Sequence, residues 1–392
     1  MNSDPSIDSK KISKLDKTLL EPPERVYFHF NMANILMSDR LEATRKRISP
    51  HNRSFLVQVY QWLHGNKAFA RMAQIFTIGC IGSFLFHDIA EEELFRNLYM
   101  CLCYVNCSMS TLFWASNRVE AEQVLVELKN IARALEKWSK SEQLTKLIHA
   151  SNRAKLVVDS YHMNAAVFVV YFVVYPALSQ SLALSIRLLP STGIWFWGLH
   201  SLQGVIMTVS CVAATALLSY HVEVTICLST LLANLSRNFQ TVKRGDHLNE
   251  LIQKHQELLD TSHKFRVLFA GWTFIQVSAM LILLISNTFI CIRGSRDPGI
   301  VMVIPVCLVF VYVFCFFGES LIVASEKVNW CVYKSNWLQA GPAFRRKLVM
   351  VIARSQTPET LDAGLLGVLN LPTFTKILRI WFKFVQALLN LL

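Results

Sequence analysis

The side chains of this sequence that could do chemistry are the few ionisable residues within its apolar stretches. His221 and Glu223 come nearest to a reactive pair, but residues two positions apart on a helix point to different faces. The sequence has no glycine-rich phosphate loop, no His-Glu-x-x-His and no nucleophile placed with a base. We interpret this pair as structural polar groups and not as a metal or proton site, and we predict a chain that is not an enzyme and needs no cofactor or metal.

Four more charged residues lie in the last two apolar stretches. Glu319 is a lone carboxylate that must face protein or water and find a partner if it lies within a membrane. Lys376, Arg379 and Lys383 share one face of the final helix. The first two can either snorkel to the inner interface or face water. Lys383 lies deeper, and its position favours a water-filled path.

The elements that position these residues are predicted by composition. Of 392 residues, 53% are hydrophobic and 17% are charged, against about 25% charged in soluble domains. Mean hydropathy is +0.36. Apolar stretches close to the roughly 20 residues that a helix needs to cross a membrane lie at about 72–90, 97–116, 161–186, 199–228, 267–292, 299–323 and 372–392. The sequence therefore predicts an all-α, seven-transmembrane helical bundle.

Basic loops predict the orientation of this bundle. Lys and Arg concentrate in residues 1–71, 117–158, 236–266 and 326–354, whereas the alternate loops are short and mostly poor in them. We therefore expect a cytoplasmic amino terminus and an extracellular carboxyl terminus. The net charge of +12 then reflects this bias and an anionic lipid leaflet, and we predict no nucleic-acid partner. The ten cysteines show neither zinc-site nor disulfide spacing.

Several helices are expected to extend into the cytoplasm. Residues 119–150 carry apolar side chains at helical spacing, the fourth span continues towards Phe239, and the fifth begins before its apolar run. The apolar positions are Val124, Leu128, Ile131 and Leu135 in the first segment. They are Leu231, Leu232 and Leu235 in the continuation of the fourth span, and Leu251, Leu258 and Leu259 at the start of the fifth. We expect one domain over 1–392, with a cytoplasmic region at 1–71, anchor helices at about 326–362 and a final helix at 372–392.

The segment between Leu321 and Phe374 closely resembles the carboxyl-terminal block of insect odorant receptors. The resemblance rests on the order and spacing of Tyr333 and Trp337, Arg345-Arg346-Lys347, Ser355-Gln356-x-Pro358, Ala363-Gly364, Leu369-x-Leu371 and Thr373-Phe374. Elsewhere the likeness is one of overall layout.

The resemblance implies three sets of functional residues. The seventh helix would line the central pore of a tetramer, with Lys383 facing the path and an apolar gate among Phe384, Ala387, Leu388 and Leu391. The subunit anchor would comprise Trp330, Tyr333, Trp337, Thr373 and Phe374. An odorant pocket in the outer half would be lined by Leu98, Tyr99, Leu102, Cys103, Tyr171, Phe172, Tyr175, Ser179, Met207, Cys211, Asn287 and Pro305.

The resemblance also implies the function. The short 236–266 connection is typical of a ligand-tuning subunit, which would form a heterotetrameric, non-selective cation channel with the odorant co-receptor and bind a small volatile organic ligand. Its place would be the plasma membrane of olfactory sensory neuron dendrites, in contact with membrane lipid. One alternative is a gustatory-type tastant-gated channel, although Thr373-Phe374 and the following TKILRIW depart from that family's pattern. A metabotropic seven-helix receptor is opposed by the inverted topology.

Overall fold

The protein is described by a computed structural model over residues 91–136, 193–242, 245–293, 298–335, 337 and 341–391, with single positions at 71, 74, 75, 78, 160, 163 and 170. The predicted spans at 72–90 and 161–186 therefore lie almost wholly outside the described residues. The regular elements are α5 (Glu91–Glu136), α7 (Gly193–Thr241), α8 (Gly245–Ile292), α9 (Pro298–Tyr333), α10 (Pro342–Arg354), the 3-10 turn η4 (Gly364–Leu366) and α11 (Leu371–Leu391). The regular secondary structure of the described residues is helical apart from one isolated bridge between Asp362 and Val368, which confirms the all-α class.

The long helices extend well beyond a membrane. α5, α7 and α8 contain 46, 49 and 48 residues, which at a rise of 1.5 Å per residue is about 70 Å, against about 30 Å of hydrocarbon. Within the described residues, three segments are long and apolar enough to cross a membrane: Leu217–Thr241, His247–Ile292 and Val303–Tyr333.

The predicted helical extensions beyond the apolar spans are present, and their cytoplasmic side stays a prediction. Val124, Leu128, Ile131 and Leu135 are all buried, and so are Phe239, Leu251 and Leu258. The structure differs from the prediction in one respect, since the amphipathic segment is not a separate helix but the continuation of α5 from the second span. No glycine or proline occurs in α5 to interrupt it. The predicted helix beyond residue 136 lies outside the described residues.

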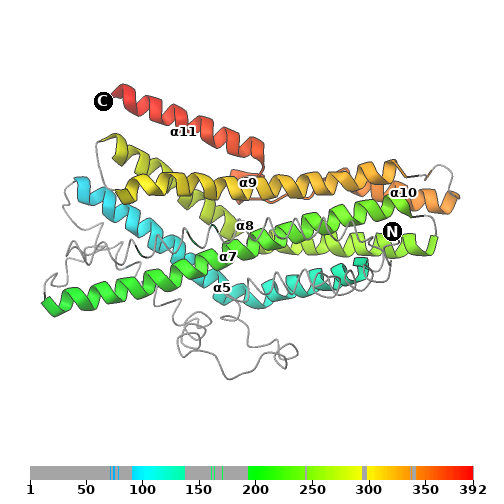
Figure 1. The fold of residues 1–392 in the computed structure, drawn as a ribbon, viewed down its shortest axis with the longest axis horizontal. Coiled ribbons are helices and arrows are strands. Elements are labelled where there is room, and N and C mark those ends of the chain that lie inside the picture. The colour runs from blue at the N-terminus through cyan, green and yellow to red at the C-terminus, as the bar shows by residue number, and fades with distance from the viewer. Residues whose placement is uncertain are drawn as a thin grey trace, which may run out of the picture.

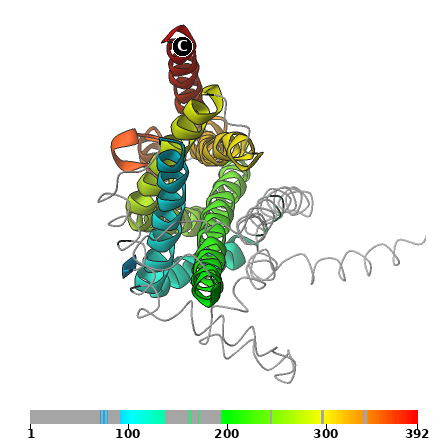
Figure 2. The same ribbon diagram turned by 90° about the vertical axis from the view of Figure 1, so that its left-hand side faces the viewer.

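Among the described elements, the long helices α5, α7, α8 and α9 lie side by side, and the shorter α10 and α11 pack on them (Figure 1). α5 and α9 each pack against both α7 and α8. α10 lies against α8 and α9 at the end of the bundle that the sequence predicts to be cytoplasmic, called here the inner end. α11 stands off the bundle in both views and contacts only α9 and α8 extensively among the described elements (Figures 1 and 2).

The inner ends of these helices share one apolar core. Leu128, Leu232, Leu258, Val328 and Leu348 come from five different helices, and each is buried in a single hydrophobic cluster. This cluster holds α10 against the long helices, and the chain that follows α10 leads into α11.

Candidate functional site

A network of hydrogen bonds joins α5 to α8 within the bundle. The hydroxyl of Ser110 accepts from Gln276 Nε2 at 2.6 Å and from Trp272 Nε1 at 3.2 Å. The same hydroxyl donates to the carbonyl of Asn106 at 3.1 Å. All of these side chains are buried. Because buried polar groups are costly unless paired, this network is a rigid polar layer at mid-bundle.

His221 and Glu223 are both buried in the bundle. The imidazole of His221 is enclosed by aromatic rings, with centroids 4.8 Å from Phe314 and 5.0 Å from Phe265, and its Nε2 lies 3.5 Å from Thr273 Oγ1. Its environment is that of a structural core residue. No group of three metal-binding side chains occurs among the described residues.

The residues predicted to line the odorant pocket are only partly placed. Cys211 and Asn287 are buried, Leu102 is half-buried, and Pro305 is exposed on α9. The backbones at Leu98, Tyr99, Cys103 and Met207 lie in α5 or α7, but their side chains lie outside the description, as do Tyr171, Phe172, Tyr175 and Ser179 altogether. The pocket therefore stays a prediction.

The amino end of α11 is fixed to α9. The carboxylate of Glu319 accepts a hydrogen bond from the backbone N–H of Leu371 at 3.3 Å, the first residue of α11. A carboxylate at a helix amino terminus is favoured by the helix dipole and by the free N–H groups there. Glu319 thus finds its partner in the backbone of the last helix.

A close approach of backbones accompanies this bond. A methyl group on Gly318 would overlap the carbonyl oxygen of Leu369. Asn370 Oδ1 accepts from the N–H of Thr373 at 2.9 Å, and Thr373 Oγ1 donates to the carbonyl of Val368 at 2.8 Å. Thr373, which we predicted as part of the subunit anchor, therefore helps to begin α11.

Two further contacts define the side of α11 that faces the bundle. Phe374 packs edge-on against Tyr312 of α9 at 5.3 Å, and Trp381 Nε1 donates to Thr288 Oγ1 of α8 at 3.0 Å. With 100° per residue, Lys383 lies on the opposite side from Phe374 and Trp381.

No side chain in α11 is buried. Lys383, Ala387 and Leu391 are exposed, and Phe384 and Leu388 are half-buried. The predicted gate residues therefore lie on a helix whose outward side is not covered by any described part of this chain.

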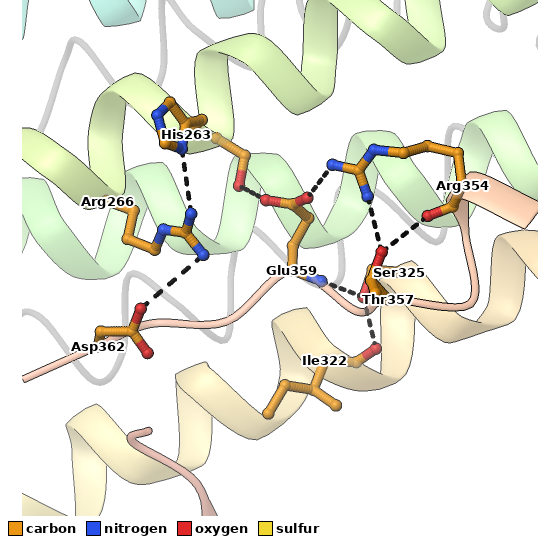
Figure 3. A network of polar contacts seen from close by, with 9 residues as sticks. His263, Arg266, Ile322, Ser325, Arg354, Thr357, Glu359 and Asp362 are labelled. Atoms are coloured by element: carbon orange, nitrogen blue, oxygen red, sulfur yellow. Dashed lines mark hydrogen bonds and ion pairs between the residues drawn. The ribbon is translucent and has the colours of Figure 1, made fainter. Parts of the chain in front are cut away.

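A polar cluster joins the inner helices to the chain that leads into α11 (Figure 3). Glu359, which is buried, accepts from Ser262 Oγ of α8 at 2.9 Å and from Arg354 Nη2 of α10 at 3.0 Å. Its backbone N–H donates to Ser325 Oγ of α9 at 3.0 Å. Nearby, Arg266 of α8 pairs with Asp362 at 3.8 Å. Glu359 thus connects three helices.

The predicted aromatic anchor residues differ in their environments. Trp330 and Tyr333 are exposed, whereas Trp337 packs on the inner core and donates from Nε1 to the carbonyl of Tyr333 at 3.2 Å. The described residues of this chain leave the side chains of Trp330 and Tyr333 exposed, so both can contact a partner.

Sequence reasoning missed Gly318 and Glu359. Gly318 precedes the lone carboxylate Glu319, and a glycine there could have indicated a close helix contact. Glu359 lies in a predicted cytoplasmic segment, where a charge is normally solvated. No local pattern distinguishes it.

A family model described as 7tm Odorant receptor matches residues 91–382. The chain belongs to the insect odorant receptor family. This odorant receptor is 26% identical over 166 residues to putative odorant receptor 92a of Drosophila melanogaster, a match that covers 39% of this chain and 40% of that protein. It is 20% identical over 347 residues to odorant receptor 10 of Aedes albopictus, covering 81% and 91% respectively.

The fold of this odorant receptor matches that of solved relatives. The structure of the olfactory receptor OR5 from Machilis hrabei in complex with eugenol superposes with a TM-score of 0.73 at 12% identity, covering 88% of this chain and 93% of that one. A second structure of OR5 gives a TM-score of 0.69 at 15% identity. The predicted seven-helix membrane fold is therefore confirmed, while the orientation of the two termini stays a prediction.

Proposed function

We propose that this odorant receptor is a ligand-tuning subunit that binds small volatile molecules in the outer half of its bundle. On this proposal it opens a non-selective cation channel that it forms with the odorant co-receptor as a heterotetramer. The OR5 structure with eugenol supports a small organic ligand for a receptor of this fold. The short 236–266 connection supports the tuning role.

The observation that carries the channel proposal is the exposed, charged side of α11. A lipid-facing helix would avoid a cation deep in the membrane, yet α11 presents Lys383 as an exposed residue on the side away from Phe374 and Trp381. A water-filled path between subunits accounts for such a face. The apolar residues that follow Lys383 suit a constriction that closes by dewetting.

Contacts to the bundle give α11 a means of responding to a ligand. Its amino end is held by Glu319, and its middle meets α8 at Thr288. Thr288 directly follows Asn287, a predicted pocket residue. A shift of α8 on ligand binding would therefore reach α11 through one hydrogen bond.

The test is current recording in cells that express this chain with and without the co-receptor, with G-protein signalling blocked. We expect odorant-evoked cation currents only when both chains are present. Currents that vanish when G-protein signalling is blocked would instead identify a metabotropic receptor. A large current from this chain alone would remove the need for the heteromer.

A further inference from the structure

The amide of Asn287 is only half satisfied. Asn287 lies in α8 with 0% of its surface exposed. Its Nδ2 donates to the carbonyl oxygen of Leu283 at 2.7 Å. Because a carbonyl can only accept, the atom beside it must be the amide nitrogen, and the other atom is the oxygen. That oxygen, Oδ1, has no hydrogen-bond partner in the structure as far as the described residues extend.

Asn287 points into the bundle and not towards lipid. It follows Gln276 by eleven positions (287 − 276), which is about three helical turns, so the two side chains lie on the same side of α8. Gln276 is bonded to Ser110 of α5, so this side faces α5. Asn287 is thus on the α5 side of α8, about 16 Å farther along α8 towards the predicted outer end.

A second buried amide oxygen without a partner lies on α5, on the side of Ser110. Asn106 precedes Ser110 by one helical turn on α5 and is buried, and its Oδ1 also has no partner among the described residues. The single indole N–H of Trp272 and one N–H of the Gln276 amide donate to Ser110. Among the described residues, two buried amide oxygens between α5 and α8 therefore lack a hydrogen-bond donor.

A buried acceptor without a partner is unfavourable, and a ligand that supplies a donor removes this penalty. An ether, ketone or hydrocarbon of the same shape supplies no hydrogen and leaves the oxygen unpaired. A site that contains such a group discriminates strongly between a ligand with the matching hydrogen and an analogue without it.

We propose that Asn287 Oδ1 accepts a hydrogen bond from the ligand, and that the ligands of this receptor are apolar molecules with one hydroxyl donor, namely alcohols or phenols. This inference rests on the proposed function, since it specifies the chemistry of the same ligand site. The hydroxyl of the ligand would then contact the residue that precedes Thr288, and Thr288 accepts a hydrogen bond from Trp381 of α11.

The experiment compares matched pairs of volatiles on cells that express the receptor with the co-receptor. Each alcohol or phenol is paired with its O-methyl ether, and each secondary alcohol with its ketone. We expect the hydroxyl member to activate at a concentration about tenfold lower, the value of one hydrogen bond of ordinary strength. In Asn287→Leu this preference disappears because the hydroxyl members lose potency and the ethers do not.

Asn117→Leu is the matched control, because Asn117 makes the same bond to the carbonyl four residues earlier, Nδ2 to Phe113 at 2.9 Å. It should keep the preference. If Asn287→Leu fails to reach the surface, Asn287→Ser, which keeps an acceptor oxygen, should retain part of the preference for hydroxyl compounds.

Two results would overturn this inference and leave the proposed function standing. One is equal potency of the paired compounds on the natural receptor. The other is a loss of response in Asn287→Leu that is equal for ethers and alcohols. An absence of current with every volatile would overturn the proposed function and this inference together.

Discussion

Replacing Glu359 by alanine should weaken the attachment of α11 to the inner bundle. The substitution removes two carboxylate hydrogen bonds, to Ser262 and to Arg354, in a side chain that is 7% exposed. Hydrogen bonds to charged groups contribute about 1.5–3 kcal/mol each. The Arg354 side chain is 48% exposed, so its share falls towards the roughly 0–1 kcal/mol of surface pairs. We expect a total loss of about 2–4 kcal/mol.

The assay is thermal unfolding of the full-length receptor in detergent, followed by loss of the monodisperse peak in size-exclusion chromatography. Glu257→Ala is the matched control, because Glu257 pairs with Lys254 at 2.6 Å on the same helical bundle but is 37% exposed. Glu359→Ala should lower the unfolding midpoint clearly more than Glu257→Ala. Glu359→Gln, which keeps the size of the side chain, should lie between the two. Equal shifts for both alanine variants would refute the role that we assign to Glu359.

Three further predictions concern α11 and use four substitutions. Gly318→Ala should displace the carbonyl of Leu369 and abolish surface complexes with the co-receptor, as measured by surface biotinylation; wild-type levels would contradict the close contact. Trp381→Phe and Thr288→Val each remove one partner of the same hydrogen bond, so each should shift the odorant concentration–response curve. The double variant should show about the same shift as either single variant. Additive shifts would show that this bond does not couple the two residues. Lys383→Gln removes a charge whose interaction with a cation 4 Å away is roughly 4 kcal/mol at an effective dielectric of 20. The permeability ratios measured from reversal potentials should therefore change, while the ranking of odorants stays the same. Unchanged permeability ratios would place Lys383 away from the ion path.

The parts of the fold that the sequence predicted are those governed by helical periodicity. Leu128, Phe239 and Leu258 lie at apolar positions repeated along one helix face, and each is buried as expected. The cost of a charge in a membrane likewise predicted that Glu319 has a partner. In both cases the physical reason is local to one helix, so one sequence is sufficient.

The features that the sequence did not predict depend on contacts between distant segments. Glu359 and Ser262 are 97 positions apart, and Gly318 matters only because Leu369 crosses it. The unpaired oxygen of Asn287 arises because its nitrogen bonds within the helix. None of these follows from periodicity or composition.

The central claim is that one side of α11 lines a water-filled pore and the other packs on the bundle. Cysteine substitution followed by a charged, membrane-impermeant thiol reagent tests this most directly, with odorant-evoked current as the readout and the natural receptor as the control for its ten cysteines. The account predicts that Ala387→Cys, on the same side as Lys383, is modified and changes the current in the presence of odorant. Val385→Cys, on the same side as Trp381, should be unaffected. Modification of Val385→Cys with no effect on Ala387→Cys would contradict the account.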